Sequence, residues 1–201
     1  MKRALTIQNI MDKKYRTLEL TGEWREAFGP METQGVWFVW GRSGNGKTRF
    51  VMQLCKELTK FGRGLYVSLE EGSGLTFANA LHDTGMQEVG RRMLVTEPEY
   101  GDADGLIADL TARMKRQRSP MFIVIDSFQY TGLTFRQYTS GASRLLAMVS
   151  LSLVCVLRGR STMPPSLTPS IGSVMTCPCL LRQNVGLTAI SAERFRISCQ
   201  S

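Results

Sequence analysis

The chain has 201 residues, of which 43% are hydrophobic and 21% are charged. This composition excludes a collagen-like, a wholly disordered or a coiled-coil protein, and the length is typical of one domain. The longest uncharged apolar stretch, residues 145–157, has 13 residues, whereas a membrane-spanning helix needs about 20. The first residues lack the apolar region of a signal peptide. We therefore expect a cytoplasmic protein that does not enter a membrane.

The composition changes after Tyr138. Residues 139–201 hold six of the 25 Lys and Arg, one of the 17 Asp and Glu, and one of the 17 aromatic residues, but four of the five cysteines. This segment carries +5 of the net charge of +8, so the net charge is a poor indication of a basic nucleic-acid-binding face. We divide the chain into an N-terminal lead-in segment (1–34), a core (35–138) and an anomalous tail (139–201).

Strand-like and helix-like patterns alternate between residues 35 and 138. Short apolar runs predict strands at 35–40, 65–69 and 121–125. Apolar residues spaced three and four apart predict helices at 51–61 and 103–114, and indicate the start of another at 76–81. This alternation predicts an α/β fold with a mainly parallel sheet covered on both faces. Ligands of such sheets bind at the carboxyl ends of the strands.

A glycine-rich segment joins the first predicted strand to the first predicted helix. It has the pattern Gly41-x4-Gly46-Lys47-Thr48 of a phosphate-binding loop. Glycines let backbone N–H groups point at a polyphosphate, and the helix N-terminus adds its positive dipole end. Lys47 would reach the β- and γ-phosphates, and the Thr48 hydroxyl would hold Mg²⁺. We predict that ATP contacts the whole segment, Gly41, Arg42, Ser43, Gly44, Asn45, Gly46, Lys47, Thr48 and Arg49.

Acidic residues follow the second and third predicted strands. Asp126 ends the third, 79 residues after Lys47, and is the predicted second Mg²⁺ ligand beside Thr48. Hydrolysis also needs a base to activate water. Glu70 or Glu71 could supply it, and we favour Glu70 because it directly follows the apolar run. Lys47 and Glu70 are thus the predicted catalytic residues. Gln129 is equally well a γ-phosphate sensor or a surface glutamine.

The segments WGRSGNGKT, LYVSLEE and FIVIDS, in this order and spacing, resemble the RecA-like ATPases, a group that includes the RecA and RadA recombinases and the DnaB-type helicases. The similarity is greatest to short single-domain ATP-binding proteins of phages and mobile elements, and it covers roughly half of the chain, residues 35–138. It implies a three-layer P-loop NTPase fold and an ATP hydrolase that uses Mg²⁺. It further implies action on single- or double-stranded DNA in recombination, replication or mobilisation, and a homo-oligomer with ATP between subunits.

Two other functions fit the same loop. A small P-loop kinase would need an arginine-rich lid after the third strand, for which Arg158 and Arg160 are the candidates. A nucleotide-binding remnant without turnover would follow from a damaged C-terminal half. Stimulation of ATP turnover by single-stranded DNA would favour the ATPase over the kinase.

The tail predicts a sheet that is incomplete or irregular after residue 138. Residues 145–157 could form one more strand, whereas residues 161–178 carry four prolines and no periodic pattern, which predicts irregular structure. We interpret residues from about Thr139 onward as a translation in a shifted reading frame or the product of a truncated or misassembled gene. The alternative is a genuine, divergent C-terminal subdomain.

Overall fold

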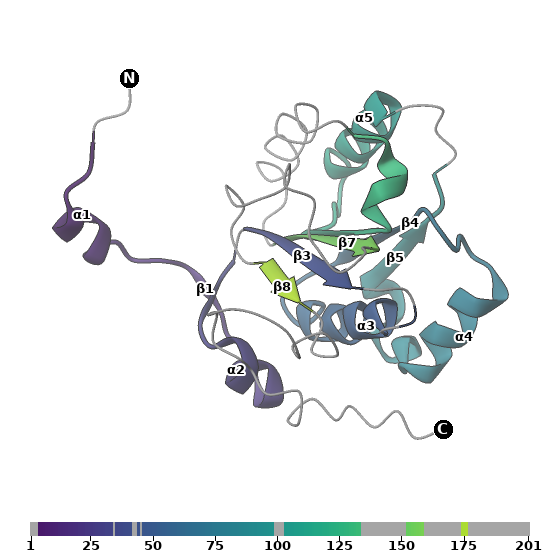
Figure 1. Cartoon of the computed structure of the whole chain (residues 1–201), viewed down its shortest axis with the longest axis horizontal. Coiled ribbons are helices and arrows are strands. Elements are labelled where there is room, and N and C mark those ends of the chain that lie inside the picture. Colours follow the sequence, from purple (N-terminus) through teal and green to yellow (C-terminus); the bar gives the residue numbers. More distant parts are fainter. Residues whose placement is uncertain are drawn as a thin grey trace. The chain divides into compact units, whose positions relative to one another are not determined.

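The computed structural model describes residues 4–33, 35–41, 44, 46–98, 103–133, 152–158 and 174–176 (Figure 1). The chain divides into two compact units, residues 1–33 and 34–201. None of the helices in these described ranges is long and apolar enough to cross a membrane.

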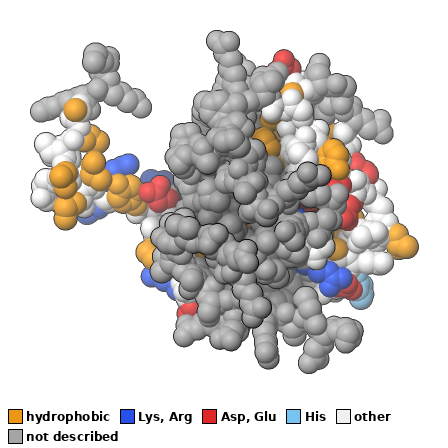
Figure 2. All heavy atoms as spheres, in the orientation of Figure 1, with side chains coloured by type: hydrophobic (Ala, Val, Ile, Leu, Met, Phe, Trp, Pro, Cys, Tyr) orange, Lys and Arg blue, Asp and Glu red, His pale blue; other side chains and the backbone are white. Residues whose placement is uncertain are grey.

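The N-terminal unit has two short helices and a two-stranded antiparallel sheet. Its elements are α1 (Ile7–Met11), β1 (Thr17–Leu18), α2 (Gly22–Phe28) and β2 (Met31–Glu32). Thr6 caps α1, because its hydroxyl accepts the Asn9 N–H at 3.1 Å. Large apolar side chains around α1 are solvent-exposed, with Ile7 at 78% and Met11 at 73%, and Figure 2 shows hydrophobic side chains gathered on the surface of this segment.

The second unit is built on a six-stranded sheet in the order β5-β4-β6-β7-β3-β8. Every pair of neighbouring strands is parallel, which confirms the predicted α/β fold with a parallel sheet. The strands are β3 (Gly35–Gly41), β4 (Gly64–Ser68), β5 (Met93–Thr96), β6 (Phe122–Asp126), β7 (Ser152–Arg158) and β8 (Val174–Thr176).

Helices connect these strands. They are α3 (Lys47–Leu58), α4 (Leu75–Asp83) and α5 (Ala103–Met114), with short 3-10 helices η1 (Met86–Arg92) and η2 (Phe128–Thr131). The apolar stripe of α3, which includes Val51, Leu54 and Leu58, is fully buried. In Figure 1, α3 lies below the sheet and α5 lies above it. All five residues of β4 and of β6 are buried, as expected for strands covered on both faces.

Most elements of the core were predictable, and the differences concern short strands. The predicted strands at 35–40, 65–69 and 121–125 correspond to β3, β4 and β6, and the predicted helices to α3, α4 and α5. The possible strand within 145–157 corresponds to β7. The prediction of irregular structure for 161–178 was wrong at residues 174–176, which form β8; a three-residue strand is too short to show a period. The rest of that stretch lies outside the described residues.

Candidate functional site

The turn between β3 and α3 has a left-handed backbone at two glycines. Gly44 has φ 81° and Gly46 has φ 71°, a region that residues with a Cβ rarely adopt. A Cβ at either position would meet no atom within 4 Å, so the backbone conformation, and not crowding, requires glycine there. Gly46 is the N-cap of α3, and its carbonyl accepts the Phe50 N–H at 2.9 Å. Arg42, Ser43 and Asn45, which we predicted to contact ATP, lie outside the described residues.

Lys47 is the first residue of α3, and its side chain is buried, with 8% of its surface exposed. A cation in the first turn opposes the helix dipole. This cost falls when an anion binds at the helix N-terminus, because the anion interacts favourably with the N–H groups and with the ammonium. The position of Lys47 therefore favours an anion-binding turn.

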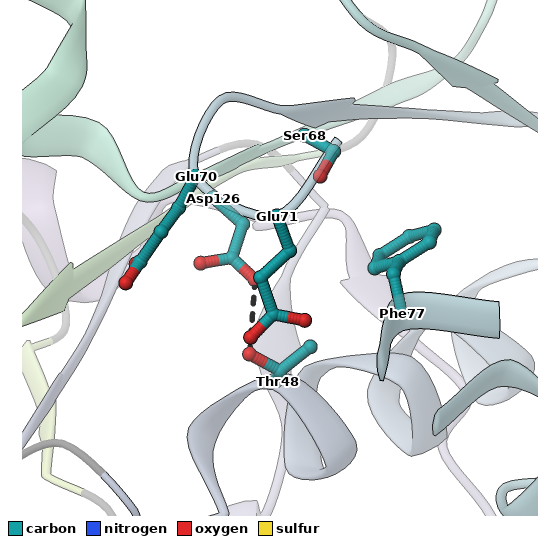
Figure 3. A pocket seen from close by; sticks show the side chains of 6 residues that line it. All are labelled: Thr48, Ser68, Glu70, Glu71, Phe77 and Asp126. Atoms are coloured by element: carbon teal, nitrogen blue, oxygen red, sulfur yellow. Dashed lines mark hydrogen bonds between the residues drawn. The ribbon is translucent and has the colours of Figure 1, made fainter. Parts of the chain in front are cut away.

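Thr48 and Asp126 meet at the carboxyl end of the sheet. The Thr48 hydroxyl donates to Asp126 Oδ2 at 3.1 Å, although the two residues are 78 positions apart in the sequence (Figure 3). One strand, β7, separates β3 from β6, so the two strands that carry the site are about 10 Å apart, twice the usual spacing. The first turn of α3 bridges this interval. The structure thus brings together the two residues that we predicted as Mg²⁺ ligands.

Two further hydroxyls that the sequence analysis did not single out lie beside Asp126. Tyr66 of β4 donates to Asp126 Oδ2 at 2.5 Å, and the Ser127 hydroxyl lies 3.1 Å from Asp126 Oδ1. Burial raises the pKa of Tyr66 well above its ordinary value, and the charge of Asp126 raises it further. Burial likewise raises the pKa of the Cys55 thiol, with a smaller contribution from Asp126. Tyr66 therefore remains protonated at neutral pH and can act as a donor.

Glu70 and Glu71 lie in the turn that follows β4. The Ser127 hydroxyl lies 2.5 Å from Glu70 Oε2, which places Glu70 next to the residue that follows Asp126. Figure 3 shows the two glutamate side chains extending in different directions, that of Glu71 towards Thr48. Both residues line the same pocket, so each could reach a water molecule there, and the choice of Glu70 stays a prediction.

The turn after β4 is held in place by Glu97, which follows β5. The Ser73 backbone N–H donates to Glu97 Oε1 at 2.5 Å, and the Ser68 hydroxyl donates to the Gly72 carbonyl at 3.0 Å. Gly72 has φ 58°, and a Cβ there would lie 1.8 Å from Glu97 Oε1. The backbone therefore favours glycine at this position, and a Cβ would displace the exposed Glu97 carboxylate from the Ser73 N–H.

A small pocket, partly open to solvent, lies among these groups. Its cavity volume is about 10 Å³, roughly the space of one water molecule, so it suits an ion or a water better than a whole nucleotide. Its lining residues are Thr48, Ser68, Glu70, Glu71, Phe77 and Asp126.

The oxygen atoms of this pocket fit Mg²⁺. Magnesium prefers oxygen ligands, and protein sites commonly supply one or two carboxylates while phosphates and waters complete the shell. Asp126 provides one such carboxylate, and the Thr48 hydroxyl provides a second oxygen beside it. Among the residues that the structure describes, no group of three or more His, Cys, Asp and Glu side chains could hold a metal ion by itself. Mg²⁺ at this site would therefore need phosphate or water oxygens as further ligands.

Two further candidates are not among the residues that line the pocket. Arg49 forms an ion pair with Asp83 at the end of α4, with its guanidinium Nη2 2.6 Å from Asp83 Oδ2, and half of its side chain is exposed. Gln129 lies in η2 and is exposed. Nothing in these positions tests a nucleotide contact by Arg49 or a sensing role for Gln129, so both remain predictions.

Comparison of the sequence with models of known protein families and with curated proteins finds no match. The RecA-like resemblance therefore rests on the three motifs and their spacing.

Proposed function

We propose that this chain is an ATP-binding protein with a RecA-like core, an Mg²⁺-dependent ATPase that acts on DNA. The observation that carries the proposal is the 3.1 Å hydrogen bond between Thr48 Oγ1 and Asp126 Oδ2. It joins the helix that follows the glycine-rich turn to the end of a buried strand. This is the carboxyl end of the sheet, where α/β proteins bind ligands. Nucleotide phosphates and Mg²⁺ need this combination of groups.

In the proposed complex the phosphates lie against the N-terminus of α3. The N–H groups of the turn point at the phosphate oxygens, and the Lys47 ammonium adds a positive charge at the β- and γ-phosphates. Thr48 and Asp126 would hold Mg²⁺ through their oxygen atoms, and the ion would neutralise charge on the same phosphates.

Turnover further requires a group that accepts a proton from the attacking water. Glu70 is our candidate, because it lines the pocket and its Oε2 lies 2.5 Å from the Ser127 hydroxyl, directly after Asp126. The pocket is thus lined both by the proposed metal ligands and by the candidate base.

Action on DNA and assembly into a homo-oligomer are parts of the proposal that rest on the RecA-like resemblance alone. Single-stranded DNA is expected to stimulate ATP turnover. Phosphate transfer from ATP to a nucleotide or metabolite, without stimulation by DNA, would favour the kinase instead. ATP binding without turnover would favour a remnant.

The proposal is tested by replacing Lys47. Lys47→Ala removes the side-chain cation at the phosphates, so we expect ATP binding, measured with a fluorescent ATP analogue, to fall at least tenfold, a change of about 1.4 kcal/mol, and turnover to be lost. Lys115→Ala is the matched control, because Lys115 is exposed beyond the end of α5, and it should bind ATP like the wild type. Full binding and turnover by Lys47→Ala would overturn the assignment.

A further inference from the structure

Tyr66 occupies the middle of β4 and is almost completely buried, with 1% of its surface exposed. Its ring packs against Phe77 of α4, with 5.3 Å between ring centroids. Its hydroxyl donates to Asp126 Oδ2 at 2.5 Å. The hydroxyl group thus points at a residue to which we assign a metal-binding role, and not at a backbone group of its own strand.

Asp126 Oδ2 lies between two hydroxyl donors. Tyr66 approaches it from β4 and Thr48 from α3, the latter at 3.1 Å. A carboxylate on its own can rotate about the bond to its Cβ. Hydrogen bonds to fixed donors restrict this rotation, as partners of ligating carboxylates do in metal sites.

The donor in β4 is held firmly in place. β4 and β6 are neighbouring parallel strands, with Tyr66 opposite Val124 and Ser68 opposite Asp126. Both strands are buried along their whole length. The position of the Tyr66 hydroxyl relative to the Asp126 backbone is therefore set by the sheet itself.

We propose that Tyr66 is a positioning residue for Mg²⁺, whose hydroxyl orients the Asp126 carboxylate towards Thr48. The inference rests on the proposed function, because it assumes that Thr48 and Asp126 hold the ion. Tyr66 does not touch the ion in this scheme. It acts through Asp126, and its removal lowers the affinity for Mg²⁺ without changing the groups that contact the nucleotide.

A different result is expected if the role of Tyr66 is purely structural. If the hydrogen bond only stabilises the core, its loss lowers stability and affects ATP binding equally with and without Mg²⁺. If Tyr66 positions Asp126, the loss is confined to the response to Mg²⁺. The two roles are therefore separated by measuring nucleotide binding under both conditions.

The test uses the full chain and a fluorescent ATP analogue, titrated with Mg²⁺ and, separately, in the presence of EDTA. For Tyr66→Phe, which retains the ring, we expect the Mg²⁺ concentration at half-maximal response to rise roughly tenfold, the lower end of the effect of removing a partner of a metal ligand. Binding in EDTA should equal that of the wild type. Tyr130→Phe is the matched control, because it removes the hydroxyl of an exposed tyrosine, and it should leave both values unchanged.

An unchanged Mg²⁺ response in Tyr66→Phe, or an equal loss with and without Mg²⁺, would overturn the inference while leaving the proposed function standing. A wild-type chain that binds no ATP analogue would overturn the proposed function, and this inference with it. Tyr66→Met, whose flexible side chain adapts to irregular space in a core, provides the same comparison if the phenylalanine variant does not fold.

Discussion

Ser127 has one hydroxyl proton and two carboxylate neighbours. Its Oγ lies 2.5 Å from Glu70 Oε2 and 3.1 Å from Asp126 Oδ1. A serine hydroxyl donates one hydrogen bond at a time, so it can serve only one of these acceptors at any moment. The shorter distance favours donation to Glu70. In the proposed mechanism Ser127 thus links the predicted base to the predicted metal ligand.

The assignment of the base is tested by two neighbouring substitutions. Glu70→Gln keeps the size of the side chain and an oxygen that can accept from Ser127, but an amide cannot take a proton from water. We expect ATP binding to persist and turnover to fall by about 10²-fold or more, the usual contribution of a general base. Steady-state turnover and analogue binding are measured on the same preparation.

Glu71→Gln is the matched control, because the same change is made one position along the same turn. It should retain most of the turnover. Loss of turnover in Glu71→Gln together with its retention in Glu70→Gln would reverse the assignment, as the direction of Glu71 towards Thr48 in Figure 3 allows.

The residues of the site were predictable to different degrees. Thr48 and Asp126 could be paired from the sequence, because a glycine-rich loop and a strand ending in an aspartate form a recognisable combination. Tyr66 could not be singled out, because a tyrosine within an apolar run is also what a core strand needs. Glu97 likewise gave no signal, since its role depends on the fold bringing the end of β5 beside the turn after β4.

At the scale of elements, the turn between β4 and α4 depends on Gly72. A side chain there would have to adopt a left-handed backbone, and it would displace the Glu97 carboxylate from its hydrogen bond with the Ser73 N–H. Gly72→Ala should therefore lower the free energy of unfolding by more than the roughly 1–2 kcal/mol that alanine costs in a left-handed backbone conformation. Denaturant titration monitors this change.

Gly132→Ala is the control for this prediction. Gly132 has a similar backbone, with φ 63°, but a Cβ there would meet no atom within 4 Å. An equal loss of stability in the two variants would show that backbone strain alone matters and that the contact with Glu97 contributes nothing.

Length and flanking residues decided which elements could be predicted. The helices α3 and α5 each have 12 residues, enough for a helical period to stand out. β5 was missed, because Met93–Thr96 is a four-residue edge strand in which Leu94 and Val95 are half-exposed. Its place in the sheet comes from pairing with β4, a contact that no local pattern encodes.

At the scale of the whole molecule, the tail contributes the strand that joins the two halves of the sheet. β7 pairs with β3 on one side and with β6 on the other. The two halves of the described sheet therefore meet through a segment that belongs to the tail. Beyond β7 and β8, residues 139–201 lie outside the described residues, and the hypothesis of a shifted frame stays a prediction.

The coding DNA tests that hypothesis directly. Reading the other two frames from about codon 138, we expect one open continuation that restores Lys, Asp and Glu to ordinary frequency and encodes an apolar strand ending in a polar residue. Stop codons in both alternative frames would contradict a frame shift and leave the divergent subdomain.

The position of β3 has a consequence for the order in which the chain is made. Both described partners of β3, the strands β7 and β8, follow it by more than a hundred residues. At roughly 5–20 residues per second, a ribosome takes on the order of 6 to 23 seconds to proceed from Gly35 to Ser152. Throughout that interval the backbone N–H and C=O groups of β3, including those of Trp37 and Val39, have neither β7 nor β8 to pair with. A nascent chain thus carries an unpaired apolar strand that can associate with other chains until β7 has been synthesised.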